Sequence, residues 1–384
     1  MGGGGGVGPE GGPTHPKRAV SMSSLGRLDF SVSRIALGLR HLSPHLKDLI
    51  RHAIELGVKY VDLGYPYDAH LHEAKMKMVR EALDGADGEG VRIALTLPTY
   101  EICRGASATP WVEGATEILG RQVDLCLFGF LREESWSRLK AQGAIEWMEK
   151  MRETGNVKVF GFSMHDDVQV LRRILADYEG WEICQFQYSF LDVDHHPGIG
   201  GLQVASEQRK GVIVSEPLKG GRILKGIPDE VADVWSRAGR REVAELALRW
   251  VLGHKEVSTV IVGTMDAPRL ERDLEIAQAE GYELTVEELT LLNTVRERYR
   301  KLRPIPCLSC YLCMPCPVGI DAPRVMELFN DASVYGDLQI PKTFYSEEGH
   351  RPQTCTECGL CEKRCPRKIP ISHWLKEAMG LFEN

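Results

Sequence analysis

The chain has 384 residues, which is too long for one small domain and suits a barrel with an additional domain. Hydrophobic residues make up 43% of the sequence and charged residues 26%, so an ordinary globular core is expected. The net charge is −7 and there is no basic block, which argues against nucleic acid or an anionic membrane as the main partner. No apolar run approaches the length that spans a membrane.

The first 16 residues are rich in glycine and lack the apolar region of a signal peptide. We therefore expect residues 1–18 to form a disordered tail and the protein to be cytoplasmic. Three scattered cysteines, Cys103, Cys126 and Cys184, are expected to be buried small hydrophobic residues in a reducing compartment.

After a tight turn at 25–28, short strand-like runs alternate with helical patterns. The predicted strands are 33–38, 58–62, 91–95, 123–128, 157–161, 183–186, 212–215 and 257–262. The predicted helices are 44–56, 72–83, 111–119, 141–154, 168–176, 201–208, 231–235, 242–252 and 269–279. This alternation favours a parallel, closed (β/α)8 TIM barrel. The periodicity alone also allows an open doubly wound sheet, but no G-x-G-x-x-G follows the first strand.

A further helix is predicted at 285–299, where Thr285 is a good N-cap and acidic residues follow in the first turn. The prolines within 303–306 then mark a domain boundary. We expect the barrel to occupy residues 19–301 and a small α-helical, ferredoxin-like domain to occupy 302–384, ending in a helix at 373–381.

Eight of the eleven cysteines lie in two runs of this last domain. The second run, 355–366, has the spacing C-x2-C-x2-C-x3-C-P, with which a short loop wraps a [4Fe–4S] cluster. The first run, 307–317, has one residue fewer before its last cysteine. Zinc ribbons also use C-x2-C pairs, but they need no third and fourth cysteine followed by proline. Disulfides would need an oxidising compartment.

Two [4Fe–4S] clusters are therefore predicted. In a two-cluster arrangement, the cysteine before each proline binds the cluster of the other run. The predicted ligands of one cluster are Cys307, Cys310, Cys313 and Cys365. The predicted ligands of the other are Cys316, Cys355, Cys358 and Cys361.

From residue 25 to its end the sequence resembles the aldo/keto reductase superfamily, and more closely the branch with a C-terminal iron–sulfur domain. The sequence segments that carry the resemblance are 25–27, 57–62 with Tyr67 and Glu73, 161–165, 185–188, 216–221, 246–250 and 262–264. The resemblance implies a catalytic set of Asp, Tyr, Lys and His, in which Tyr protonates a carbonyl while NAD(P)H donates hydride. A lysine beside the tyrosine would lower its pKa from about 10.

The sequence keeps only half of that set. Asp62 and Tyr67 match, five residues apart, but Thr96 stands in place of the lysine and Gly129 in place of the histidine. Another histidine near a strand end could take over the role of the missing lysine or histidine, and this alternative stays open. The candidates are His41, His70, His72 and His165, of which His165 is the best placed to face the pocket.

The nucleotide site that the resemblance implies is also mixed. Ser163 and Gln185 would hold the nicotinamide amide, but Met164 replaces an asparagine and Ser215 a stacking aromatic residue. Lys219 with Gly220 and Gly221 would approach the pyrophosphate. Gly263, Thr264 and Arg269 would face the adenosine phosphate, where Asp273 replaces an asparagine. NAD(P)H is thus a possible cofactor.

Three functions are compatible with these features. The preferred one is an iron–sulfur oxidoreductase of the aldo/keto reductase family that acts in electron transfer, with a redox partner such as a ferredoxin. The second is an NAD(P)H-dependent carbonyl reductase with accessory clusters. The third is a non-catalytic redox-sensing or binding protein. The substrate is not indicated by the sequence, and neither nucleic acid nor membrane is an expected partner.

Overall fold

The computed structural model describes residues 20–39, 42–84, 88–194, 196–225, 227–238, 242–264, 266–278 and 281–383. The predicted Gly-rich tail and His41 lie outside these ranges. Within them, no helix is both long and apolar enough to cross a membrane.

Eight parallel strands form a closed barrel in the order β10-β3-β4-β5-β6-β7-β8-β9. They are β3 (Ile35–Gly38), β4 (Tyr60–Asp62), β5 (Arg92–Leu97), β6 (Leu125–Leu131), β7 (Val159–Met164), β8 (Ile183–Gln187), β9 (Gly211–Ser215) and β10 (Thr259–Val262). Because β10 pairs with both β9 and β3, the sheet has no open edge. The predicted (β/α)8 barrel is confirmed, and the open doubly wound sheet is wrong.

Alternation along each strand builds two apolar layers. On β6, Leu125 and Leu127 belong to the cluster inside the barrel, whereas Cys126 and Phe128 belong to the layer between the strands and the helices. Side chains therefore fill the barrel interior as in other small barrels. Cys126 and Cys184 are completely buried, as predicted, while Cys103 is only partly buried.

A two-stranded hairpin, β1 (Met22–Ser24) and β2 (Ser31–Ser33), closes the amino-terminal end of the barrel with Leu25 in the inner core. Its predicted turn depends on Gly26, which has φ +61°. A Cβ at this position would lie 2.4 Å from the backbone nitrogen of Gly211. Only glycine therefore lets the hairpin approach the start of β9 so closely.

The outer helices are α1 (Leu46–Glu55), α2 (Ala69–Asp84), α4 (Thr109–Leu119), α6 (Ala144–Glu153), α7 (Val168–Asp177), α8 (Gly198–Glu207), α10 (Val243–Leu252) and α11 (Ala267–Gln278). Four short helices lie between barrel elements: α3 (Thr99–Cys103), α5 (Glu133–Ala141), α9 (Asp229–Trp235) and η2 (Ser236–Ala238). A 3-10 segment, η1 (Lys219–Leu224), follows β9. The predicted helix at 141–154 corresponds to α6 and includes only the last residue of α5, and α3 was not predicted.

Helix α12 (Val286–Leu302) leads from the barrel into the C-terminal domain. It begins with the predicted Thr285 cap: the Glu288 N–H donates to Thr285 Oγ1 at 3.2 Å, and the Thr285 N–H donates to Glu288 Oε2 at 2.8 Å. Leu292 and Val295 of this helix pack with Trp235 in one apolar cluster. Helix α12, which links the two domains, is thus packed against the barrel domain and is not a flexible linker.

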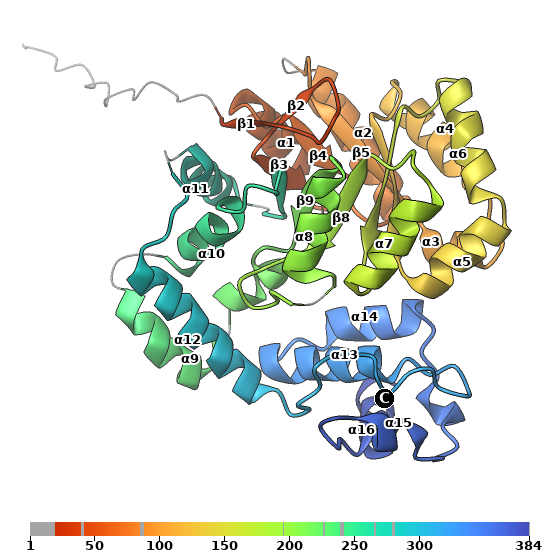
Figure 1. The fold of residues 1–384 in the computed structure, drawn as a ribbon. Helices are drawn as coiled ribbons and strands as arrows, with labels where there is room; N and C mark the ends of the chain where they lie inside the picture. Colours follow the sequence, from red (N-terminus) through yellow and green to blue (C-terminus); the bar gives the residue numbers. More distant parts are fainter. Residues whose placement is uncertain are drawn as a thin grey trace, which may run out of the picture.

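The C-terminal domain contains α13 (Ala322–Tyr335), α14 (Gln339–Glu347), η3 (Pro352–Thr354), α15 (Leu360–Arg364) and α16 (Ile371–Phe382) around a separate apolar core. Helices α13 and α14 lie between the barrel and the rest of this domain (Figure 1). Helices α15 and α16 lie on the far side, next to the C-terminus (Figure 1). The domain therefore presents one pair of helices to the barrel.

Candidate functional site: two cysteine-lined cavities beside a covered barrel mouth

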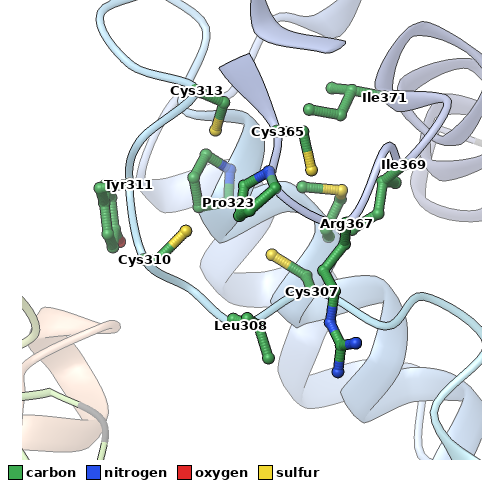
Figure 2. Close-up of a pocket in the computed structure, with 12 residues that line it drawn as sticks. Cys307, Leu308, Cys310, Tyr311, Cys313, Pro323, Cys365, Arg367, Ile369 and Ile371 are labelled. Atoms are coloured by element: carbon green, nitrogen blue, oxygen red, sulfur yellow. The ribbon is translucent and has the colours of Figure 1, made fainter. Parts of the chain in front are cut away.

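The first cavity brings together four cysteines that are up to 58 positions apart in the sequence: Cys307, Cys310, Cys313 and Cys365. Their sulfur atoms point into one space (Figure 2). The chain turns tightly here, since Ser309 and Tyr311 both have positive φ angles, 47° and 56°. The Ser309 N–H donates to Cys307 Sγ at 3.4 Å, a contact that stabilises a negatively charged sulfur. Apolar side chains of α13, among them Pro323 and Met326, complete the wall.

The second cavity contains the other four cysteines, Cys316, Cys355, Cys358 and Cys361, and Cys313 lies between the two cavities and lines both. Gly359, with φ +69°, reverses the chain between Cys358 and Cys361 and starts α15. In each cavity, three cysteines of one run thus meet the cysteine that precedes proline in the other run. This is the grouping that the two-cluster arrangement requires.

The chemistry of these donors fits clusters better than single metal ions or disulfides. In the described part of the chain, no three His, Cys, Asp or Glu side chains are close enough to hold one ion. The thiolates of a [4Fe–4S] cluster bind different iron atoms and therefore stand farther apart. All eleven cysteines are free. Burial raises the pKa of the Cys307 thiol and raises that of Cys313 to about 12, so thiolates there need the charge of bound iron.

At the carboxyl ends of the barrel strands, Asp62 is the last residue of β4 and is buried. Its Oδ1 accepts a hydrogen bond from the Gly64 N–H at 3.0 Å. Burial raises the pKa of the Asp62 carboxyl to about 6, against opposing effects of the Gly64 hydrogen bond and the charge of Lys75. Lys75 on α2 is only 7% exposed. The positive charge that acts on the Asp62 carboxylate is therefore that of Lys75 on helix α2. It does not come from strand β5, where the resemblance implied a lysine.

Tyr67 is 43% exposed and stands in a group of aromatic rings at the barrel mouth. Its ring centroid lies 4.7 Å from Tyr65, 6.3 Å from Phe130 and 6.1 Å from Phe344. Phe344 belongs to α14 of the C-terminal domain. It also lies 5.4 Å from Phe130 and 6.3 Å from His165. The C-terminal domain therefore contributes a wall of the barrel mouth.

Ion pairs hold the same two helices over the mouth. Arg132, which follows β6, pairs with Asp321 at the start of α13. On the opposite side, Lys219 Nζ lies 2.7 Å from Asp192 Oδ2 and 3.9 Å from Asp331 Oδ2 of α13. Arg222 Nη1 lies 3.3 Å from the same Asp331 oxygen. The carboxylates of the C-terminal domain thus neutralise cations on the rim of the barrel.

A family model for aldo/keto reductases matches residues 34–296. The chain belongs to the aldo/keto reductase family. A second family model, for a 4Fe–4S dicluster domain, matches residues 306–370. The second match supports bound iron–sulfur clusters in the domain that holds both cavities. The predicted domain boundaries at 18/19 and 301/302 stay predictions.

Solved aldo-keto reductases share the fold. The holo form of AKR11C1 from Bacillus halodurans is 19% identical, with a TM-score of 0.59 over 72% of this chain and 96% of its own. The thermostable reductase Tm1743, in complex with the inhibitor epalrestat, is 17% identical, with a TM-score of 0.56 over 72% and 100%. MGS-M4, from a Medee basin deep-sea metagenome library, is 16% identical, with a TM-score of 0.55 over 71% of this chain and 94% of its own. Among curated proteins, no significant match was found.

Within this aldo/keto reductase barrel, the space beside Gly129 is already occupied. A Cβ on Gly129 would lie 2.6 Å from Cδ2 of the Tyr65 ring and 2.9 Å from Cγ2 of Thr96. The Tyr65 ring therefore occupies the space that a side chain at position 129 would need. The hydroxyl of Tyr65 accepts a hydrogen bond from the Tyr100 N–H at 3.3 Å, which fixes the ring in place.

We expect Gly129→His to destabilise the protein by about 1–3 kcal/mol, because the new ring overpacks against Tyr65. Thermal unfolding of the iron-loaded protein measures this loss. The matched control is Gly114→His on α4, where no heavy atom lies within 4 Å of the added Cβ. The double variant with Tyr65→Ala should recover part of the loss. An unchanged melting temperature for Gly129→His would contradict the packing argument.

Two of the candidate histidines are buried. His72 on α2 is 1% exposed, its ring nitrogens have no partner in the described part of the chain, and burial lowers its pKa to about 4. His165, just after β7, is 4% exposed, and its centroid is 4.9 Å from Phe130 and 6.1 Å from His196. Burial holds the pKa of His165 well below its ordinary value, so the ring is neutral. His70 is exposed on α2.

The residues predicted to hold nicotinamide have different surroundings. Ser163 Oγ accepts a hydrogen bond from the Phe130 N–H at 2.8 Å, so this hydroxyl is already engaged. Gln185 is 8% exposed, and its Oε1 has no partner among the described residues. Ser215 Oγ donates weakly to the Phe186 carbonyl at 3.4 Å. Of the three, Gln185 has an acceptor atom with no partner among the described residues, and the Ser163 hydroxyl still has its O–H to donate.

The predicted phosphate-binding residues are largely paired within the protein. Lys219 has the partners described above. Arg269 Nη2 lies 2.6 Å from Asp273 Oδ1, and its Nη1 lies 3.5 Å from Glu242 Oε2. Thr264 Oγ1 accepts from the Asp266 N–H at 3.2 Å, and Gly263 is exposed. A nucleotide would therefore have to displace existing anionic partners of both cations.

Proposed function

We propose that the protein is an iron–sulfur oxidoreductase in which electrons reach or leave a small ligand in the barrel mouth through the cysteine domain, rather than as hydride from NAD(P)H. The observation that carries this proposal is the position of α13. Its Asp331 pairs with both Lys219 and Arg222, the cations of the segment on which a pyrophosphate was expected. A dinucleotide in that position would meet a carboxylate instead of a free cation, which opposes its binding.

The incomplete catalytic set supports the same function. Thr96 cannot supply a cation to Tyr67, and Tyr65 fills the space at Gly129. Positioned proton transfer contributes about 10²–10⁴-fold to a rate, so a hydride-transfer reaction without these groups is expected to be slow. The neutral ring of His165 is the best remaining candidate to orient a ligand by a hydrogen bond, since it faces Phe130 at the mouth.

A short bonded route connects the first cysteine cavity with the mouth. Tyr311 lines that cavity and follows Cys310 directly. Its hydroxyl accepts a hydrogen bond from Arg132 Nη2 at 3.3 Å. Arg132 is two residues from Phe130, whose ring lies among the mouth aromatics. Bound at these cysteines, [4Fe–4S] clusters would supply one-electron redox chemistry close to the ligand site.

An NAD(P)H-dependent carbonyl reductase is the second candidate. The unsatisfied Oε1 of the buried Gln185 and the exposed ring of Tyr67 favour it, because the resemblance assigns these two residues to nicotinamide binding and proton transfer. This function requires one of two things. Either α13 moves away from η1, or the nucleotide binds without pyrophosphate contacts to η1.

Anaerobic reduction of the iron-loaded protein separates the two candidates. We expect NADPH alone to leave the clusters oxidised and to reduce simple aldehydes poorly, with Tyr67→Phe changing little. A low-potential one-electron donor should give the EPR signal of reduced clusters. Rapid NADPH-dependent turnover that Tyr67→Phe abolishes would favour the carbonyl reductase and refute the proposal.

A further inference from the structure

The two cysteine cavities differ in their relation to the barrel. The first is linked to Arg132 through Tyr311 and shares α13 with the barrel interface. The second is enclosed by residues 313–322 and 355–361 with Ser372 and Leu375 of α16. Its Cys358 is exposed, as is Cys310 of the first cavity. An external redox protein can therefore approach the second cavity without displacing the barrel.

A basic patch lies between and beside the two cavities. It consists of four exposed cations within six residues: Lys363, Arg364, Arg367 and Lys368. Lys368 Nζ donates to the Lys363 carbonyl at 3.3 Å, and Arg364 Nη1 donates to the Met314 carbonyl at 3.4 Å. The patch therefore borders the loop of the first cysteine run as well as that of the second.

The carboxylates near this basic patch are engaged elsewhere. Glu362 Oε1 accepts hydrogen bonds from the Ser372 N–H and hydroxyl at 2.9 and 2.6 Å. Glu357 Oε1 lies 2.7 Å from Lys376 Nζ. Among the described residues, none of the four patch cations forms an ion pair with a carboxylate, so their charges are available to an anionic partner.

Exposed apolar side chains accompany the basic patch. Leu360 is 38% exposed and lies three and four residues before Lys363 and Arg364, on the same side of α15. Val318, which lines the second cavity, is 41% exposed. Small apolar centres with charged rims are typical of protein interfaces, and weak redox encounters use the smallest of them.

We propose that an acidic one-electron carrier protein docks on this basic patch and exchanges electrons with the protein at the site of Cys358. The proposal rests on the proposed electron-transfer function and adds the surface and the charge of the partner. One electron leaves the carrier as the iron–sulfur centre gains it, or the reverse, and no bond forms or breaks. The whole chain carries a charge of −7, which repels an acidic partner at long range. At physiological salt, screening beyond about 8 Å leaves the local patch to decide docking.

The test compares two double variants of the iron-loaded protein that change the net charge equally. Lys363→Glu with Lys368→Glu reverses two of the four cations of the basic patch and so cancels its net charge. Lys77→Glu with Lys150→Glu reverses two exposed cations on α2 and α6 of the barrel. The probe is a reduced acidic ferredoxin, and the readouts are its dissociation constant and the rate of cluster reduction by stopped flow. Reduced methyl viologen serves as a small reductant that needs no docking surface.

We expect the patch variant to weaken ferredoxin binding and slow reduction about tenfold or more at low salt, with the effect fading as salt rises. The barrel variant and all viologen rates should stay within about twofold. Equal ferredoxin rates and affinities for both variants would overturn the docking surface while leaving the proposed function intact. Clusters that no donor reduces would instead refute the proposed function itself.

Discussion

Removal of iron is expected to unfold the cysteine domain while the barrel stays folded. The core of this domain includes Cys313 and Cys365, and residues 303–321 between α12 and α13 contain no helix or strand. A domain of this size with so much irregular backbone rarely folds without disulfides or bound metal. For structural zinc in small domains, the binding free energy that drives folding is about 10–16 kcal/mol, and clusters should act on a similar scale. The barrel has its own much larger core.

Iron analysis and amide hydrogen exchange measure both parts of this prediction. Fully loaded protein should contain about eight iron atoms per chain, as two [4Fe–4S] clusters require. The apoprotein should exchange rapidly throughout α13–α16 and keep its protection in the barrel strands. Cys361→Ser should lose one cluster, whereas the control Cys103→Ser, on the barrel, should keep its iron. About four iron atoms in loaded wild-type protein, or a protected apo domain, would contradict the prediction.

The barrel could be predicted from the sequence because its signal is local and repeated. Short runs such as 123–128 are apolar on both faces, which is typical of parallel strands covered by helices. Helices α13 and α14 were missed between the cysteine runs, although α13 has clear local signals. Asp321 caps it by accepting from the Arg324 N–H at 3.1 Å, and Gly336 ends it with φ +61°.

The barrel mouth could be predicted only in part, because its decisive contacts join distant segments. The spacing of Asp62 and Tyr67 is visible in the sequence. The insertion of Phe344, the Tyr65 ring over Gly129 and the pairing of Asp331 with Lys219 depend on tertiary packing. Lys75 had a detectable signal, since it follows the buried His72 by three residues on the inner face of α2.

Arg324→Met is expected to destabilise the contact between the cysteine domain and the barrel by about 3–5 kcal/mol. Arg324 is 4% exposed on α13 and binds Glu348 with three hydrogen bonds: Nη2 to Oε1 at 2.8 Å, Nε to Oε2 at 3.0 Å and Nε to Oε1 at 3.2 Å. Its Nη1 donates to Glu327 Oε2 at 3.0 Å, and Glu327 in turn meets His196 of the barrel at 2.9 Å. Methionine preserves much of the volume but removes the guanidinium between two buried carboxylates. Among the described residues, Glu327 then keeps only His196. Glu348 keeps His350 and, at 3.9 Å, Arg132.

The effect of this change should depend on pH. Burial alone would raise the pKa of Glu348, but Arg324 and a hydrogen bond from His350 outweigh burial and hold it well below the ordinary value. In the wild type, this stabilisation is present above the unfolded-state pKa, about 4.3, and is lost as pH falls through the lower folded pKa. Without Arg324, burial dominates, the folded pKa rises, and protonation on acidification stabilises the variant. The difference in stability should therefore shrink as pH falls from 7 toward 4.

Hydrogen exchange of α13 and α14 in the iron-loaded protein measures the opening free energy of this interface at each pH. The control is Arg300→Met on α12. The Arg300 side chain pairs with Glu297 and Asp194 and is 38% exposed. Such surface pairs contribute about 0–1 kcal/mol. A loss for Arg324→Met no larger than that of the control, or one that grows on acidification, would show that the buried network does not hold the domain over the mouth. If the network does hold it there, the weakened interface should also release Lys219 from Asp331 and raise the affinity for NADPH.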